Sequence, residues 1–111
     1  MTRLYIVVPC YNEQEVLPET SRRLLLKMQD LIESQRISED SRVVYVDDGS
    51  KDATWDLIEK QHQENALFQG IKLAHNKGHQ NALLAGLMSV REKADAVISM
   101  DGHLLMVILT R

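Results

Sequence analysis

The chain has little cysteine, little net charge and no long apolar run, and each of these absences excludes a class of protein. Because Cys10 is the only cysteine among 111 residues, neither an internal disulfide nor a multi-cysteine metal site can form. We expect Cys10 to be a small core residue and the protein to be cytoplasmic, where thiols stay reduced. The net charge of −3 gives no basic footprint, so no nucleic-acid partner is expected.

The longest apolar run covers residues 104–109, well short of the roughly 20 residues that a membrane-spanning helix needs. A content of 44% hydrophobic and 26% charged residues is ordinary for a globular protein. A chain of 111 residues is long enough for one hydrophobic core. We therefore expect a single soluble domain over residues 1–111.

Strand and helix patterns alternate along the chain. Runs of apolar and β-branched residues at 4–8, 43–46, 68–74 and 95–100 predict four strands. Three helical patterns lie between them. The first should open with Pro18 in its first turn, and Ser50 or Asp52 can cap the second. The buried side of the third is predicted to carry Leu83, Leu84, Leu87 and Val90. This alternation predicts an α/β fold with a parallel, doubly wound sheet of four strands and three helices.

Two adjacent carboxylates, Asp47 and Asp48, end the second predicted strand and are followed by Gly49 and Ser50. In open α/β sheets, ligands bind outside the carboxyl ends of the strands. Paired carboxylates at such a place suit a ribose, the polar edge of a base or a metal-bound phosphate. The alternative interpretation is that they only cap the helix that follows.

Polar residues also follow the first predicted strand, which Pro9 should end because it cannot donate to a sheet ladder. Tyr11 can stack on a flat base, while Asn12 and Glu13 can hydrogen-bond its edge. The alternative is that Asn12 caps a helix, with Glu15 completing a capping box.

The third and fourth predicted strands lead to candidates for binding a phosphate. Gly78 allows close approach of the backbone, and Lys77 adds a positive charge beside a helix N-terminus. No G-x-G-x-x-G follows the first strand and no G-x-x-x-x-G-K-[ST] occurs anywhere, so the phosphates need another cationic partner. A divalent ion, Mg²⁺ or Mn²⁺, held by Asp101 at the end of the fourth strand is the natural substitute.

Three motifs taken together resemble the family-2 glycosyltransferases with the GT-A fold: residues 7–13 (VVPCYNE), 46–54 (VDDGSKDAT) and 76–82 (NKGHQNA). The polyprenol-phosphate sugar transferases look most similar. The likeness covers nearly all of residues 4–101. It implies the N-terminal, donor-binding part of an enzyme that transfers a sugar, with inversion, from a nucleoside-diphosphate sugar to a lipid phosphate or glycan acceptor. Full-length relatives would associate with the cytoplasmic face of the membrane.

The resemblance also implies roles for individual residues. The nucleoside pocket would be lined by Pro9, Tyr11, Glu13 and Asp48, with Lys77 and Gly78 near the diphosphate. Asp101 would open an Asp-x-Asp motif that holds Mg²⁺ or Mn²⁺. The residues themselves add Asn12 and Asp47 to the nucleotide-binding candidates.

Residues 102–111 depart from the family pattern. His103 stands where the family has a second acidic residue, and it remains a candidate ligand because imidazole binds Mn²⁺. The apolar residues 104–109 then replace a polar segment. A truncation or a changed reading frame after Asp101 explains both features, and a genuine buried strand is the alternative. An exposed apolar edge there would favour self-association.

Two other functions fit parts of the sequence. A non-catalytic nucleotide-binding or regulatory module would keep the pocket without the chemistry. A phosphate-receiver-like signalling domain would explain Asp47 and Asp48 as a Mg²⁺ site but not the cluster from Pro9 to Glu13. We expect this chain to bind a donor without transferring its sugar at a useful rate, because the acceptor must be held beside the donor.

Overall fold

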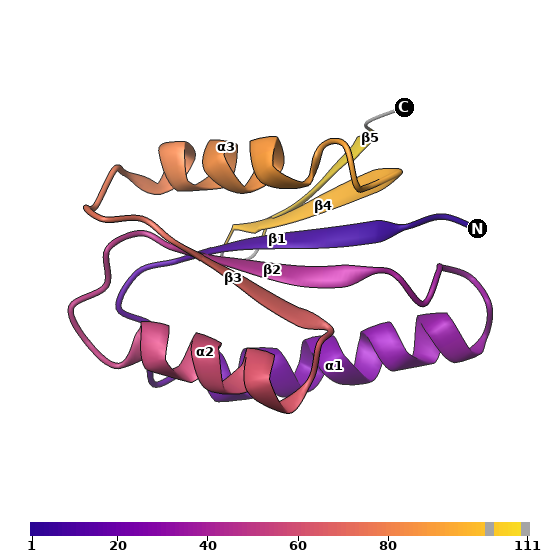
Figure 1. Ribbon diagram of the computed structural model, residues 1–111, viewed down its shortest axis with the longest axis horizontal. Coiled ribbons are helices and arrows are strands. Elements are labelled where there is room, and N and C mark those ends of the chain that lie inside the picture. Colours follow the sequence, from indigo (N-terminus) through magenta and orange to yellow (C-terminus); the bar gives the residue numbers. More distant parts are fainter. Residues whose placement is uncertain (102–103, 110–111) are drawn as a thin grey trace.

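The structure, a computed structural model, describes the backbone of residues 1–101 and 104–109 and the side chains of residues 1–100. Helices and strands follow one another as β1 (Leu4–Cys10), α1 (Leu17–Glu33), β2 (Arg42–Asp47), α2 (Thr54–Glu64), β3 (Phe68–Lys72), α3 (His79–Val90), β4 (Ala96–Asp101) and β5 (Leu104–Leu109). Figure 1 shows one sheet with helices on both sides. The predicted α/β fold is confirmed.

The sheet has the strand order β3-β2-β1-β4-β5. Strands β1 to β4 are parallel, as predicted. Beyond the four predicted strands, β5 pairs antiparallel with β4, so residues 104–109 form a strand. In the described part of the chain, β5 has no neighbouring strand on its other side.

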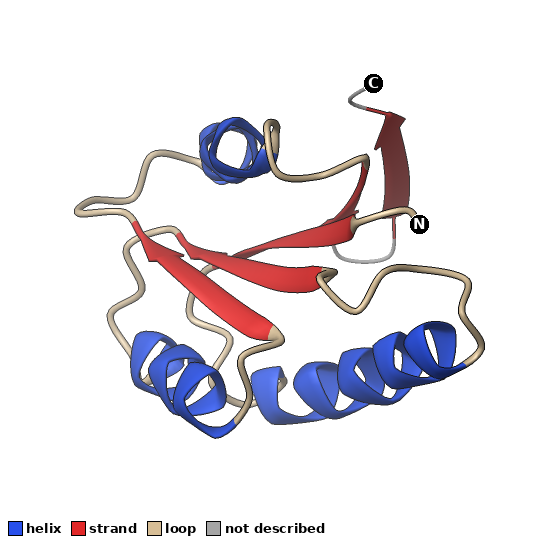
Figure 2. Cartoon of the chain, turned by 45° about the vertical axis from the view of Figure 1, so that its right-hand side comes forward, coloured by secondary structure: helices blue, strands red, loops and turns tan. Residues whose placement is uncertain are grey.

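Helices α1 and α2 cover one face of the sheet and α3 covers the other, as the turned view in Figure 2 shows. Alternate residues of the central strands divide between the two layers: Ile6 and Val8 pack toward α1 and α2, whereas Tyr5 and Val7 pack toward α3. The predicted core role of Cys10 is confirmed, since only 1% of it is exposed. Both faces of the central strands β1 and β2 are therefore buried, as in other sheets covered by helices on both sides.

Some predicted boundaries and faces were wrong. Strand β1 continues through Pro9 to Cys10. This is tolerated because the pairing of β1 with β4 ends at Val7, two residues before the proline that lacks an N–H. The third strand ends at Lys72, earlier than predicted, and the fourth runs from Ala96 to Asp101.

Helix α3 packs closest to the sheet through its small residues, and its predicted buried side is confirmed at Leu83, Leu87 and Val90 but is wrong at Leu84. Ala82, Gly86 and Val90 are buried, whereas Leu84 is 55% exposed. A Cβ on Gly86 would lie 2.4 Å from Val7 Cγ1, so this glycine lets the helix approach β1 closely. The predicted leucine face assumed that the largest apolar side chains point inward.

The start of the first helix settles one alternative. Leu17 N donates to Glu13 O at 2.9 Å in a turn before α1, and Pro18 lies in the first turn of the helix, as predicted. No side chain caps α1, so the capping-box interpretation of Asn12 and Glu15 is wrong. No helix among residues 1–101 and 104–109 combines the length and the apolar character of a membrane span.

Candidate functional site

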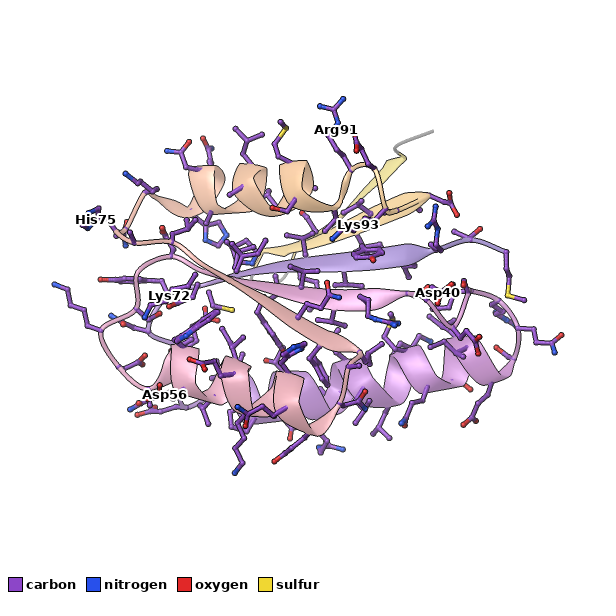
Figure 3. The ribbon with its side chains drawn as sticks, in the orientation of Figure 1. Asp40, Asp56, Lys72, His75, Arg91 and Lys93 are labelled. Atoms are coloured by element: carbon purple, nitrogen blue, oxygen red, sulfur yellow. The ribbon has the colours of Figure 1, made fainter. Side chains whose placement is uncertain are left out.

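The carboxyl ends of β1, β2 and β3 meet at one edge of the sheet because these strands are parallel. In Figure 3, His75 marks this edge and Asp40 marks the opposite one. Asp48 N donates to Cys10 O at 2.8 Å, which joins the ends of β1 and β2. Three loops therefore meet there: residues 11–16, 48–53 and 73–78.

Asp47 is completely buried at the end of β2 and is incompletely hydrogen-bonded. Its Oδ1 accepts a hydrogen bond from Ser50 N at 3.2 Å. Its Oδ2 is buried and has no hydrogen-bond partner among the described residues. A buried acceptor without a donor costs about 1–3 kcal/mol, so this oxygen marks a place that an N–H or O–H group of a ligand could fill.

Asp48 is 3% exposed and holds the third loop in place. Its Oδ1 accepts a hydrogen bond from Lys77 N at 2.7 Å. The second loop also touches the third at Gly49, where φ is +74° and a Cβ would lie 2.6 Å from Asn76 N. Only glycine combines this backbone angle with so close a contact.

The interpretation of Asp47 and Asp48 as helix caps is wrong. The carboxylate beside the start of α2 is that of Asp52, whose Oδ1 accepts from Thr54 N at 2.9 Å. The N-cap residue of α2 is nevertheless Ala53, with no side-chain cap, so the prediction that Ser50 or Asp52 caps this helix is wrong. Neither of the two buried carboxylates at the end of β2 therefore caps α2.

The first loop places three candidates differently. Tyr11 is 39% exposed, as a ring that stacks on a ligand must be. Asn12 adopts φ +51°, and its Oδ1 accepts from Lys51 N at 2.8 Å. Pro9 is buried inside β1. The structure thus gives Tyr11 an open position and ties the Asn12 oxygen to the neighbouring loop.

Glu13 is a half-buried carboxylate facing charged groups from the other loops. Burial raises its pKa, the nearby His79 opposes that shift, and Asp52 adds to it. Burial also raises the pKa of the Cys10 thiol, with contributions from the charges of Glu13 and Asp47. Glu13, Asp47 and His79 therefore belong to one electrostatic cluster, although they come from the first loop, the end of β2 and the start of α3.

Lys77 and Gly78 are exposed at the start of α3. Gly78 has φ +92°, and its carbonyl oxygen accepts from Ala82 N at 3.0 Å in the first turn of the helix. Asn81 Nδ2 donates to Lys77 O at 2.7 Å and so fixes the loop to the helix. Both residues stand where an anion at the helix N-terminus would lie.

The sequence analysis missed Gln14. Its Oε1 accepts from Ala53 N at 2.9 Å, so it is a second link between the first and second loops, beside Asn12. A signal was present in the sequence: side chains that can accept hydrogen bonds from backbone N–H groups are frequent in both loops. Their pairing, however, depends on the sheet register.

A match to a known protein family covers most of the chain. The profile described as "Glycosyl transferase family 2" matches residues 5–107. The chain belongs to glycosyltransferase family 2. A curated relative, "Uncharacterized glycosyltransferase YkoT" from Bacillus subtilis (strain 168), is 54% identical over 101 residues, which are 91% of this chain and 30% of that protein. The chain therefore spans less than a third of this relative's length.

Two solved structures are similar in fold to this chain. S. aureus TarS 1-349 superposes with a TM-score of 0.70 at 24% identity, covering 89% of this chain and 27% of TarS 1-349. Mannosyltransferase PcManGT from Pyrobaculum calidifontis, solved in complex with GDP-Man and Mn2+, gives 0.65 at 21% identity, covering 87% of this chain and 26% of PcManGT. These likenesses support the GT-A architecture predicted from the sequence.

A divalent metal is typical of GT-A glycosyltransferases. Residues 1–100 contain no group of three or more His, Cys, Asp or Glu side chains that could hold a metal ion by itself. Asp101 ends β4, the strand next to β1, so its backbone lies at the same edge as the three loops. Mg²⁺ is commonly held by one or two carboxylates plus substrate phosphates, and the described side chains end at residue 100, before Asp101. The predicted second ligand, His103, lies outside the described residues.

Proposed function

We propose that this chain is the donor-binding part of a glycosyltransferase that takes its sugar from a nucleoside-diphosphate sugar. The observation that carries the proposal is the unfilled Asp47 Oδ2 beside the buried Asp48 at the carboxyl ends of β1 and β2. Membership of glycosyltransferase family 2 supports it. A further support is that one protein with this fold was solved with GDP-Man and Mn2+.

Each loop supplies one kind of recognition in this proposal. Tyr11 stacks on the base, and the carboxylates of Glu13, Asp47 and Asp48 accept hydrogen bonds from N–H and O–H groups of the nucleoside. Lys77 and the backbone at Gly78 lie toward the diphosphate, where positive charge and the α3 N-terminus favour an anion. An ionised carboxylate suits this role because both of its oxygens accept hydrogen bonds and neither donates one.

A Mg²⁺ or Mn²⁺ ion held by Asp101, with His103 as a second candidate ligand, would supply charge that stabilises the departing nucleoside diphosphate. Lys77 would assist from the opposite loop. The protein's own contribution is to hold the donor still and to orient it toward the acceptor, which can lower the barrier by about 7–11 kcal/mol.

We further propose a polyprenyl phosphate as the acceptor, with a glycan as the alternative, and inversion at the anomeric carbon. A phosphate acceptor is ionised near neutral pH, so positioning matters more than a general base. The protein would then work at the cytoplasmic face of the membrane that holds the lipid. Copies of the chain would self-associate through the outer edge of β5.

The test of the donor site is a calorimetric titration of UDP and GDP against the wild type, Asp48→Asn and Asp48→Ala. Asparagine keeps an oxygen for Lys77 N but replaces the other acceptor with a donor, so Asp48→Asn tests recognition apart from loop anchoring. We expect it to weaken binding by about one to two orders of magnitude, and Asp48→Ala to weaken binding at least as much.

Asp40→Asn is the matched control, because Asp40 is exposed at the opposite edge of the sheet. It should bind like the wild type. If the wild type binds neither nucleotide, or if both Asp48 variants bind as tightly as the wild type, the proposed donor site is wrong.

A further inference from the structure

We propose that Asn12 and Gln14 are positioning residues that clamp the first loop to the second and thereby hold Tyr11 and Glu13 in place for the nucleotide. This inference rests on the proposed function, and it assigns Asn12 to support rather than to direct contact with the ligand. Five hydrogen bonds between residues 12–14 and residues 50–54, which we call the interloop clasp, carry it.

The clasp uses three consecutive backbone N–H groups of the first loop. Asn12 N donates to Ser50 Oγ at 2.8 Å, and Glu13 N donates to Thr54 Oγ1 at 2.8 Å. Gln14 N donates to Asp52 Oδ2 at 3.3 Å. Every backbone donor of residues 12–14 is therefore bonded to a side-chain oxygen of the second loop or of Thr54, the first residue of α2.

The second loop returns two hydrogen bonds. Lys51 N donates to Asn12 Oδ1 at 2.8 Å, and Ala53 N donates to Gln14 Oε1 at 2.9 Å. Because Asn12 and Gln14 turn toward the second loop, they alternate with Tyr11 and Glu13, whose side chains take no part in the clasp. The alternation leaves the side chains of Tyr11 and Glu13 for the ligand.

The residue types suit this task. Asn12 has φ +51°, a backbone region that asparagine tolerates better than most residues. An amide oxygen accepts an N–H without adding negative charge to a site that already contains Glu13, Asp47 and Asp52. Amide side chains therefore link the loops without making it harder to bind an anionic diphosphate.

Gln14 is the better residue to change, because it is exposed and its φ is ordinary. Gln14→Met keeps the length of the side chain but removes the acceptor, whereas Gln14→Glu keeps an acceptor oxygen. Gln63→Met is the matched control: it makes the same change at an exposed position near the end of α2. Titrations with UDP and GDP in about 0.5 M salt screen the charge added by glutamate.

We expect Gln14→Met to weaken nucleotide binding on the order of tenfold and Gln14→Glu to restore it to within about threefold of the wild type. Gln63→Met should bind like the wild type. A purely local stabilising role would change the melting temperature without this rescue pattern. Equal affinity of Gln14→Met and the wild type would overturn the inference.

Amide hydrogen exchange gives a second readout that needs no ligand. The Ala53 amide should exchange faster in Gln14→Met than in the wild type or in Gln14→Glu. The Lys51 amide should exchange faster in Asn12→Gly than in the wild type; glycine keeps the positive φ at position 12 accessible. If the wild type binds no nucleotide but these amides respond as expected, the proposed function fails and the clasp stands. If the amides do not respond, the clasp is wrong.

Discussion

Replacing Gly86 with alanine sets two known effects against each other, and the structure predicts which one wins. Gly86 lies inside α3, where alanine is favoured over glycine by about 1 kcal/mol. A Cβ at this position would, however, lie 2.4 Å from Val7 Cγ1 and 2.8 Å from Val46 Cγ2. Carbon atoms in contact normally lie about 3.5–4.0 Å apart, so the added methyl group overlaps both valines.

The valines cannot easily move away. Both are completely buried, and β-branched side chains have few alternative rotamers. Overpacking of this kind costs about 1–3 kcal/mol, and the rigid surroundings favour the upper part of that range. After subtracting the gain in helix propensity, we expect a net loss of about 1–2 kcal/mol, or a fall in melting temperature of about 4–8 °C.

The measurement is thermal and urea unfolding of Gly86→Ala beside Ala85→Gly. The control sits at the next position of α3 and makes the opposite exchange, so it should lose about 0.5–1 kcal/mol through propensity alone. Destabilisation by both changes would show that contact with the sheet, not propensity, decides at Gly86. A Gly86→Ala protein as stable as the wild type would refute this reasoning.

Three further predictions concern the core, the pH dependence and the metal. The free energy of unfolding of Tyr45→Phe, measured in urea, should be about 1–3 kcal/mol lower than that of the wild type, because buried Ser21 Oγ would lose its partner Tyr45 OH, 2.7 Å away. In the double variant with Ser21→Ala, the loss should be smaller than the sum of the two single losses. Burial raises the folded-state pKa of Glu13 above its ordinary 4.5, so folding takes up a proton there. Stability should therefore fall as pH rises from about 4.5 through the folded pKa. Unfolding curves of Glu13→Gln should lack this decline, and an unchanged decline would contradict the assignment. If Asp101 holds a metal against the diphosphate, EDTA should weaken the binding of UDP and GDP but not of uridine and guanosine. Equal affinities for the diphosphates with and without EDTA would leave Lys77 as the main cation.

The arrangement of strands and helices could be predicted from the sequence because hydrophobic periodicity and the turn residues that end each element are local patterns. Buried parallel strands are continuous apolar runs, and each run here ends in polar residues. The buried face of α3 could be predicted only in part: Leu83, Leu87 and Val90 lie on it, but Leu84 does not. Its sequence is apolar on most sides, and which side meets the sheet depends on Gly86 fitting between Val7 and Val46 on two other strands.

The candidate site was predictable in its acidic residues but not in its support. Asp47 and Asp48 stand out because carboxylates rarely follow a buried strand without a reason. That Asp48 accepts from Lys77 N, and Gln14 from Ala53 N, depends on which strands are neighbours and on their register. Such contacts join loops that are 29 and 39 residues apart in the chain, beyond the reach of any local pattern.

Asp47 Oδ2, which has no hydrogen-bond partner among the described residues, lies among loops whose backbone N–H groups are hydrogen-bonded. Nine backbone N–H groups in the surrounding loops have acceptors; they belong to residues 12–14, 48, 50, 51, 53, 54 and 77. A loosely built loop region would leave many groups unsatisfied, whereas this one leaves a single buried carboxylate oxygen among residues 1–100. Such a group lowers stability, and a donor from a ligand at the proposed nucleotide site would offset that cost.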